Sequence, residues 1–148
     1  MLDTTTTRFS HVRPGDTQPR GTGLRDLFLY RDLGVEKANA GRVLVQVVTA
    51  NMAPEKGTGW HLHEAALHIV LMLRRFMYGY REMLVAAGGC VHQRPGIVHY
   101  LFDDSPDMEY LDLVGPADFR TVGGRRFLRR AAGHAVKVTR LPGPRRPR

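Results

Sequence analysis

The sequence predicts an all-β fold, either an antiparallel sandwich or a barrel, on three observations. Apolar residues gather in short segments that alternate between two faces, which is typical of half-buried strands. Glycine and proline, 16 and 9 of the 148 residues, fall between these segments and mark turns. No segment before residue 117 shows a convincing helical period. With 43% apolar residues, the chain has enough hydrophobic side chains for one domain with one core.

The first predicted strands follow an N-terminal arm. Residues 1–22 are rich in Thr, Pro, Gly and Arg and show no apolar period, so we expect an arm that packs on the domain. Residues 27–30 predict a short strand that ends before Gly34. Residues 43–48, VLVQVV, give the clearest strand, because they are rich in β-branched side chains and alternate between two faces, with Gln46 opposite the odd-numbered valines.

Further strand signals follow along the chain. An apolar run occupies residues 66–73, and aromatic residues alternate over 76–80, which predicts another strand with its glycine as a bulge. A Pro-Gly pair at 95–96 predicts a turn between two short strands, and residues 108–116 alternate again. Residues 117–133 form the only helical candidate of any length, although two adjacent glycines interrupt it.

The net charge of +8 lies at the C-terminal end of the chain. Ten of the 22 basic residues and none of the 14 acidic residues follow Asp118, so the rest of the chain is almost neutral. A basic tail can bind phosphate backbones nonspecifically, but we expect a solvated terminus, and nucleic acid is an unlikely partner. The composition therefore divides the chain into an arm (1–22), a barrel domain (23–122) and a basic tail (123–148).

Three features concern the environment of the protein. The single cysteine, Cys90, excludes an internal disulfide and fits a reducing compartment. No stretch approaches the roughly 20 apolar residues of a membrane span. The N-terminus lacks a basic-then-apolar signal pattern. We therefore expect a cytoplasmic protein with no membrane partner.

Three of the seven histidines fall within GTGWHLHEAALHIV, residues 57–70. On an extended strand, His61 and His63 point to the same side and can chelate one ion. His68 would join them if the chain bends after Glu64, and His99 follows the predicted Pro-Gly turn, where a second hairpin could bring it across the barrel. Neutral imidazoles suit divalent transition metals such as Fe, Mn, Ni and Zn, so these four histidines form a candidate metal site.

The segments GTGWHLHEAALH and GGCVHQRPGIVH resemble the two sequence motifs of the cupin superfamily, and the likeness extends over roughly residues 23–122. His61, His63 and His99 match the histidines of these motifs, and His68 stands where the first motif has a glutamate. Other departures from the motifs are Arg75, Cys90, Arg94 and Asp103. The resemblance implies an antiparallel double-stranded β-helix, also called a jelly-roll or cupin barrel. It also implies a mononuclear metal held by an all-histidine set.

The resemblance implies two classes of function. One is a small-molecule enzyme, with dioxygenase or related chemistry in which the metal has the main part. The other is a noncatalytic module that binds a metal or small ligand, such as a sensor. Apolar walls with a few polar groups should surround the metal, and Gln46, Arg81 and Tyr110 are the predicted substrate-binding residues. Cupins commonly dimerise through edge strands, and residues 24–34 are the segment that we expect at a homodimer contact.

Overall fold

The computed structural model describes residues 6–21, 27–51, 58–72, 76–78, 83–102 and 105–123. Within these ranges the elements are one short helix and ten strands, which confirms the predicted all-β antiparallel class. The strands are β1 (Phe28–Asp32), β2 (Leu44–Ala50), β3 (His61–Glu64), β4 (Leu67–Met72), β5 (Phe76–Tyr78), β6 (Met83–Val85), β7 (Cys90–Gln93), β8 (Leu101–Phe102), β9 (Glu109–Gly115) and β10 (Arg120–Gly123), and the helix is α1 (Val35–Ala38). Within the described ranges, no helix is long and apolar enough to cross a membrane.

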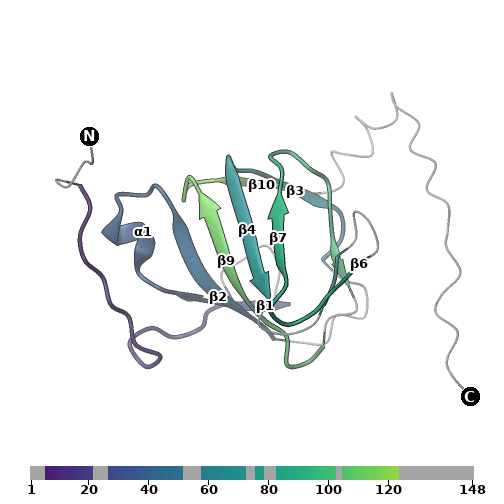
Figure 1. Ribbon diagram of the computed structural model, residues 1–148, viewed down its shortest axis with the longest axis horizontal. Coiled ribbons are helices and arrows are strands. Elements are labelled where there is room, and N and C mark those ends of the chain that lie inside the picture. Colours follow the sequence, from purple (N-terminus) through teal and green to yellow (C-terminus); the bar gives the residue numbers. More distant parts are fainter. Residues whose placement is uncertain are drawn as a thin grey trace, which may run out of the picture.

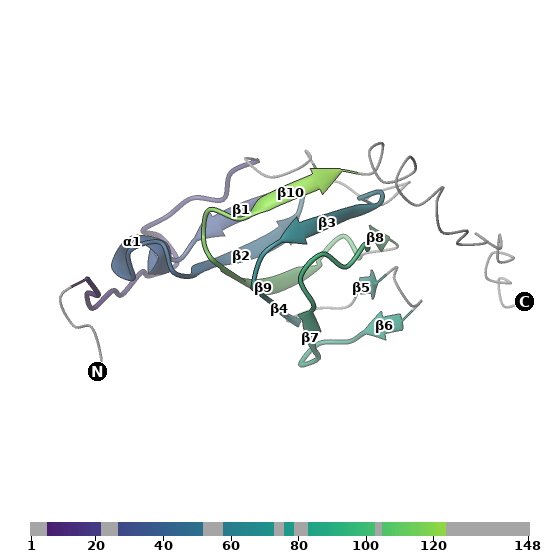
Figure 2. The same ribbon diagram turned by 90° about the horizontal axis from the view of Figure 1, so that it is seen from above.

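The strands form a barrel of two facing layers. One layer is a five-stranded sheet in the order β1-β2-β9-β4-β7. The other contains the pair β10-β3 and the three-stranded sheet β6-β5-β8, and Figure 2 shows these strands facing the larger sheet. Figure 1 shows the five-stranded sheet face on. This is the double-layered antiparallel barrel that the sequence predicts.

The register of the large sheet decides which side chains enter the barrel. Gln46 of β2 lies opposite Asp32 of β1 and opposite Asp112 of β9. Asp112 in turn lies opposite Val70 of β4. Directly opposed residues project from the same face of a sheet. These polar residues therefore share the inner face with the buried core cluster, whose members are Phe28, Val48, Val70, Val85, Leu101, Met108 and Tyr110.

The structure corrects the sequence prediction at two elements. Part of the helical candidate 117–133 is strand β10, which pairs with β3 through the register Thr121–His63. Pairing with an exposed strand edge outweighs the weak local helical preference, and Thr121 and Val122 are β-branched residues that suit a strand. The one-turn helix α1 was not predicted, because four residues are too few to show a helical period.

The N-terminal arm lies along the outer strand of the large sheet. Arg20 and Tyr30 exchange backbone hydrogen bonds of 2.9 Å, and the Thr17 hydroxyl donates to the Asp32 carbonyl at 2.7 Å. Nearer the N-terminus, the Arg8 amide donates to the Ala38 carbonyl at 2.8 Å. The described part of the arm is thus attached to β1 and α1, as the sequence suggested.

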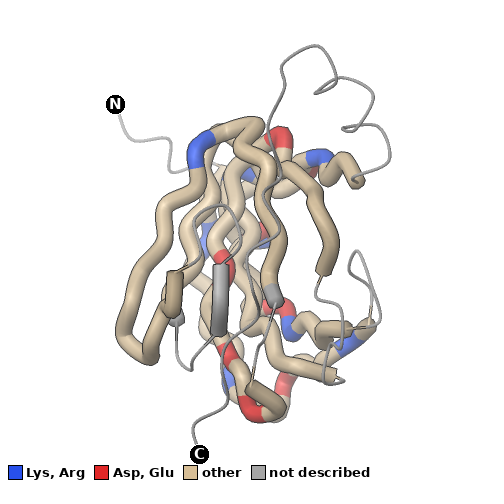
Figure 3. The backbone as a smooth tube through the Cα atoms, turned by 90° about the vertical axis from the view of Figure 1, so that its right-hand side faces the viewer, with Lys and Arg blue, Asp and Glu red and all other residues tan. Residues whose placement is uncertain are grey.

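Acidic and basic residues are interspersed along the described backbone, as Figure 3 shows. This agrees with the near-neutral composition of the chain before Asp118. Most of the predicted basic tail, residues 124–148, lies outside the described residues, as do Arg75, Gly79, Arg81 and Asp103.

Candidate metal centre

Strand β3 supplies two of the predicted histidines to the barrel interior. His61 and His63 project from the same side of the strand, and their ring centroids are 5.1 Å apart. His61 is 4% exposed, while His63 is half-buried. The alternation of a strand therefore places these two rings together, as the spacing predicts.

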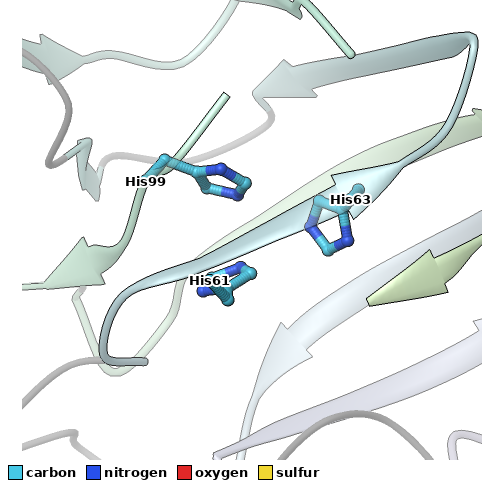
Figure 4. Close-up of side chains that lie close together, drawn as sticks. All are labelled: His61, His63 and His99. Carbon is cyan, nitrogen blue, oxygen red and sulfur yellow. The ribbon is translucent and has the colours of Figure 1, made fainter. Parts of the chain in front are cut away.

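His99 reaches the same place from the second motif. A turn at Pro95 and Gly96, with Gly96 at a φ of 69°, leads the chain back toward β3. The backbones of His61 and His99 then exchange two hydrogen bonds of 2.9 Å, and their ring centroids are 4.3 Å apart. Figure 4 shows the rings of His61, His63 and His99 gathered in the barrel interior. One ligand nitrogen of each ring lies within 4.8 Å of the others, so these three residues could hold a metal ion.

Hydrogen bonds define which nitrogen of two of these rings carries a proton. The Nδ1 atom of His61 lies 2.8 Å from the Gly59 carbonyl oxygen, and the Nδ1 atom of His99 lies 3.0 Å from the Ile97 carbonyl oxygen. A carbonyl oxygen only accepts, so each Nδ1 must donate its proton. In the neutral ring the lone pair is then on Nε2, so Nε2 is the nitrogen that can bind a metal. His63 makes its contact through Nδ1 to the Thr121 hydroxyl, at 2.9 Å.

The surroundings also keep the rings of His63 and His99 neutral. Burial, followed by the neighbouring rings of His68, His99 and His61, lowers the pKa of His63 to about 2. Burial and then His61 lower the pKa of His99 to about 3, against the Ile97 hydrogen bond, which raises it. Both imidazoles are therefore uncharged at neutral pH. Neutral rings with oriented lone pairs fit a divalent transition metal.

His68 lies beside this group and has a different partner. Its ring packs edge-on against that of His63, with centroids 4.7 Å apart, and is 6.5 Å from that of His99. Its Nε2 atom is 2.8 Å from Oδ1 of Asp112. The three-histidine group does not include it, and metal ligation by His68 stays a prediction.

Asp112 and Thr121 are two residues that the sequence analysis missed. Asp112 is buried, and its Oδ2 accepts a 3.0 Å hydrogen bond from the Gln46 side-chain amide. An acidic residue on the inward side of the alternating segment 108–116 was a signal for it, since Met108, Tyr110 and Val114 share its parity. Thr121 carried no such signal, because it lay in the segment interpreted as a helix.

The predicted substrate-binding residue Tyr110 and two chain neighbours of the histidines, Glu64 and Trp60, have different surroundings. Tyr110 is buried in the core, where its ring meets Phe28 edge-on at 6.5 Å. Glu64, at the end of β3, points to solvent with 53% of its side chain exposed. Trp60 is 40% exposed and packs on Tyr100, with centroids 4.4 Å apart.

A pocket of about 430 Å³ lies between the arm and the edge of the large sheet. Arm residues line one side, and Tyr30, Asp32 and Gln46 line the other. Burial, with a smaller effect of Asp112, raises the pKa of Tyr30 to about 12, so its hydroxyl stays protonated. Gln46, a predicted substrate-binding residue, thus borders both the pocket and the buried carboxylate of Asp112.

Comparison with known proteins gives structural matches only. No family model and no curated protein sequence matches the chain. Among solved structures, an RmlC-like cupin protein from Ralstonia eutropha JMP134 superposes with a TM-score of 0.64 and 12% identity over 86% of this chain and 90% of that one. The polyketide cyclase RemF from Streptomyces resistomycificus superposes with a TM-score of 0.63 and 17% identity, over 78% of this chain and 85% of RemF. KdgF from Halomonas sp. superposes with a TM-score of 0.59 and 14% identity, over 72% of this chain and 94% of KdgF. The chain therefore has the β-barrel fold of the cupin superfamily.

Proposed function

We propose that this protein is a small-molecule enzyme built around one divalent transition metal, held by His61, His63 and His99. The observation that carries the proposal is the convergence of three ligand nitrogens within 4.8 Å inside the barrel. Fe, Mn, Ni and Zn are the candidate metals, since neutral imidazole suits all of them. When bound, the metal would supply a Lewis acid and an attachment point for oxygen atoms.

The residues around the centre favour a small, oxygen-rich ligand. Three neutral protein ligands leave the charge of the cation uncompensated and leave coordination positions open, as in catalytic rather than structural sites. An anionic or oxygen-chelating molecule would compensate that charge. A separate pocket beside Gln46 presents hydroxyl, amide, carboxylate and guanidinium groups, and the hydrogen bonds of Gln46, Asp112 and His68 connect it to the centre.

Dioxygenase-like chemistry is one reaction class that the proposal includes, and cyclisation of a small molecule is another. RemF, whose fold this chain shares, is a polyketide cyclase. The exposed carboxylate of Glu64 follows His63 in β3 and points to solvent, so the main contribution of the described residues is to hold, orient and desolvate the ligand.

A noncatalytic module that binds a metal or small ligand is the second candidate. The position of His68 beside His63 favours it, because a fourth imidazole on the metal would leave fewer positions for a substrate. In either case we expect a cytoplasmic homodimer.

Metal analysis of the purified protein tests the proposal. We expect about one divalent ion per chain in the wild type and loss of that ion in His61→Ala and in His99→Ala. His92→Ala is the matched control, because His92 lies on β7 with an exposed side chain. Equal metal content in all four proteins would contradict the proposed centre. Oxygen uptake and product analysis with diketones, thiols and catechols would then separate an enzyme from a binding module.

A further inference from the structure

We propose that Asp112 and Gln46 are positioning residues that fix His68 as the Nε2–H tautomer, so that Nδ1 is the nitrogen of His68 that faces the metal centre. The inference deepens the proposed function and rests on it for the metal itself. It concerns a buried chain of three polar side chains, Gln46, Asp112 and His68, one from each of three neighbouring strands.

The direction of each hydrogen bond in this chain follows from its partners. An ionised carboxylate only accepts hydrogen bonds, so both neighbours of Asp112 must donate. The Gln46 side chain donates through Nε2 to Oδ2 at 3.0 Å, and His68 donates through Nε2 to Oδ1 at 2.8 Å. In the neutral imidazole, a proton on Nε2 leaves the lone pair on Nδ1.

The other nitrogen of His68 is an independent sign of a ligand. Nδ1 is fully buried and has no hydrogen-bond partner among the described residues. The side chain of His68 as a whole is only 8% exposed. A buried polar atom without a partner is costly, and such an atom in a functional barrel points to a missing ion or ligand. The ring contacts His63, which belongs to the three-histidine group, so His68 lies beside that group.

Sheet pairing makes this arrangement rigid. Gln46 and Asp112 are opposed in the β2–β9 register. Val70 of β4 also opposes Asp112, and His68 lies two residues before Val70 on the same face of β4. All three side chains therefore stand on the inner face at positions set by backbone hydrogen bonds. A carboxylate that holds the distal proton of a histidine orients its ring and raises the basicity of its free nitrogen, as such partners do at known metal sites. Asp112 thus has a role in the site without contacting the metal.

Nuclear magnetic resonance of the metal-free protein, with ¹⁵N-labelled histidine, tests the tautomers directly. We expect His61 and His99 to carry their protons on Nδ1 and His68 to carry its proton on Nε2. Asp112→Leu has a similar size but no acceptor, so the Nε2–H preference of His68 should be lost, while His61 and His99 stay unchanged. Asp112→Asn should preserve the preference, because its carbonyl oxygen can accept from His68 while Gln46 turns its amide over. A wild-type His68 protonated on Nδ1 would overturn the inference, and this measurement needs no variant to fold.

Metal affinity gives the second readout. Titration with Co²⁺ should show an affinity about 10- to 100-fold weaker in Asp112→Leu than in the wild type, with Asp112→Asn in between. An unchanged affinity in Asp112→Leu would overturn the link to the metal. The two proposals fail separately: absence of Co²⁺ binding by the wild type refutes the metal centre, whereas tight binding with the wrong His68 tautomer refutes only the role of Asp112.

Discussion

Acidification of the metal-free protein should destabilise it through the buried histidines. The pKa values of His63 and His99 are lowered to about 2 and about 3, whereas in the unfolded chain both rings have the usual pKa of 6.5. As the pH falls below 6.5, the unfolded state binds protons that the folded state does not, so stability is lost progressively down to about pH 3. Between pH 7 and pH 5, each ring should reduce the free energy of unfolding by about 2 kcal/mol. The two together should reduce it by about 4 kcal/mol.

Urea unfolding at pH 7 and pH 5, with a chelator present, measures this loss. The variant His63→Asn removes one of the two rings. It leaves the two main causes of the lowered pKa of His99, which are burial and His61. Its pH-dependent loss should therefore be smaller than that of the wild type by about 2 kcal/mol. His92→Asn should behave as the wild type does, because its side chain is exposed in both states. Carboxyl groups that titrate in the same range contribute equally to all three proteins. An equal pH dependence in His63→Asn and the wild type would refute the reasoning.

Three further predictions concern packing, turns and the metal. Met108→Ala should lower the free energy of unfolding by about 2–5 kcal/mol, measured by urea denaturation, because the side chain is 1% exposed. Gly34→Ala and Gly41→Ala should each lower it by about 1–2 kcal/mol, since their φ angles are 71° and 76°. Gly34→Ala should have the larger effect, because its new Cβ would lie 2.9 Å from an arm side chain. Thr121→Val removes the hydroxyl partner of His63 and should weaken Zn²⁺ binding about tenfold in a competition titration.

Each of these predictions has a result that would contradict it. A loss below about 1 kcal/mol in Met108→Ala would mean that the core at this position can collapse around the cavity. Equal losses in the two glycine variants would show that the arm yields freely at Gly34, since nothing lies within 4 Å of the Cβ position at Gly41. Unchanged Zn²⁺ affinity in Thr121→Val would show that the hydroxyl does not orient His63.

Local periodicity was sufficient to predict the main strands. The predicted segments 43–48 and 108–116 correspond to β2 and β9, because a period of two is set by neighbours in the chain. Strand β10 was wrongly interpreted as helix, because its pairing with β3 depends on residues almost 60 positions earlier. The sequence carried no local sign of that partner.

Some residues of the candidate site could be predicted from local pattern, and others depend on neighbouring strands. The parity of His61 and His63 is a local feature that predicted their common face. The sequence prediction added His68 and His99, and the structure groups His99, but not His68, with the first two. Asp112 and Thr121 were missed, because their importance comes from the strands beside which they lie. The pocket next to Gln46 also required the fold, since the arm forms one of its sides.

The sequence by itself determined the all-β class and the common face of His61 and His63, because strand alternation acts over a few residues. Only the tertiary structure decided that His99 meets His61 and what surrounds His68. Its partner Asp112 lies 44 positions later in the chain, and the second partner of Asp112, Gln46, lies 66 positions before Asp112. Contacts at such separations depend on strand order and register, which arise from burial and backbone pairing of the whole barrel and not from any local pattern.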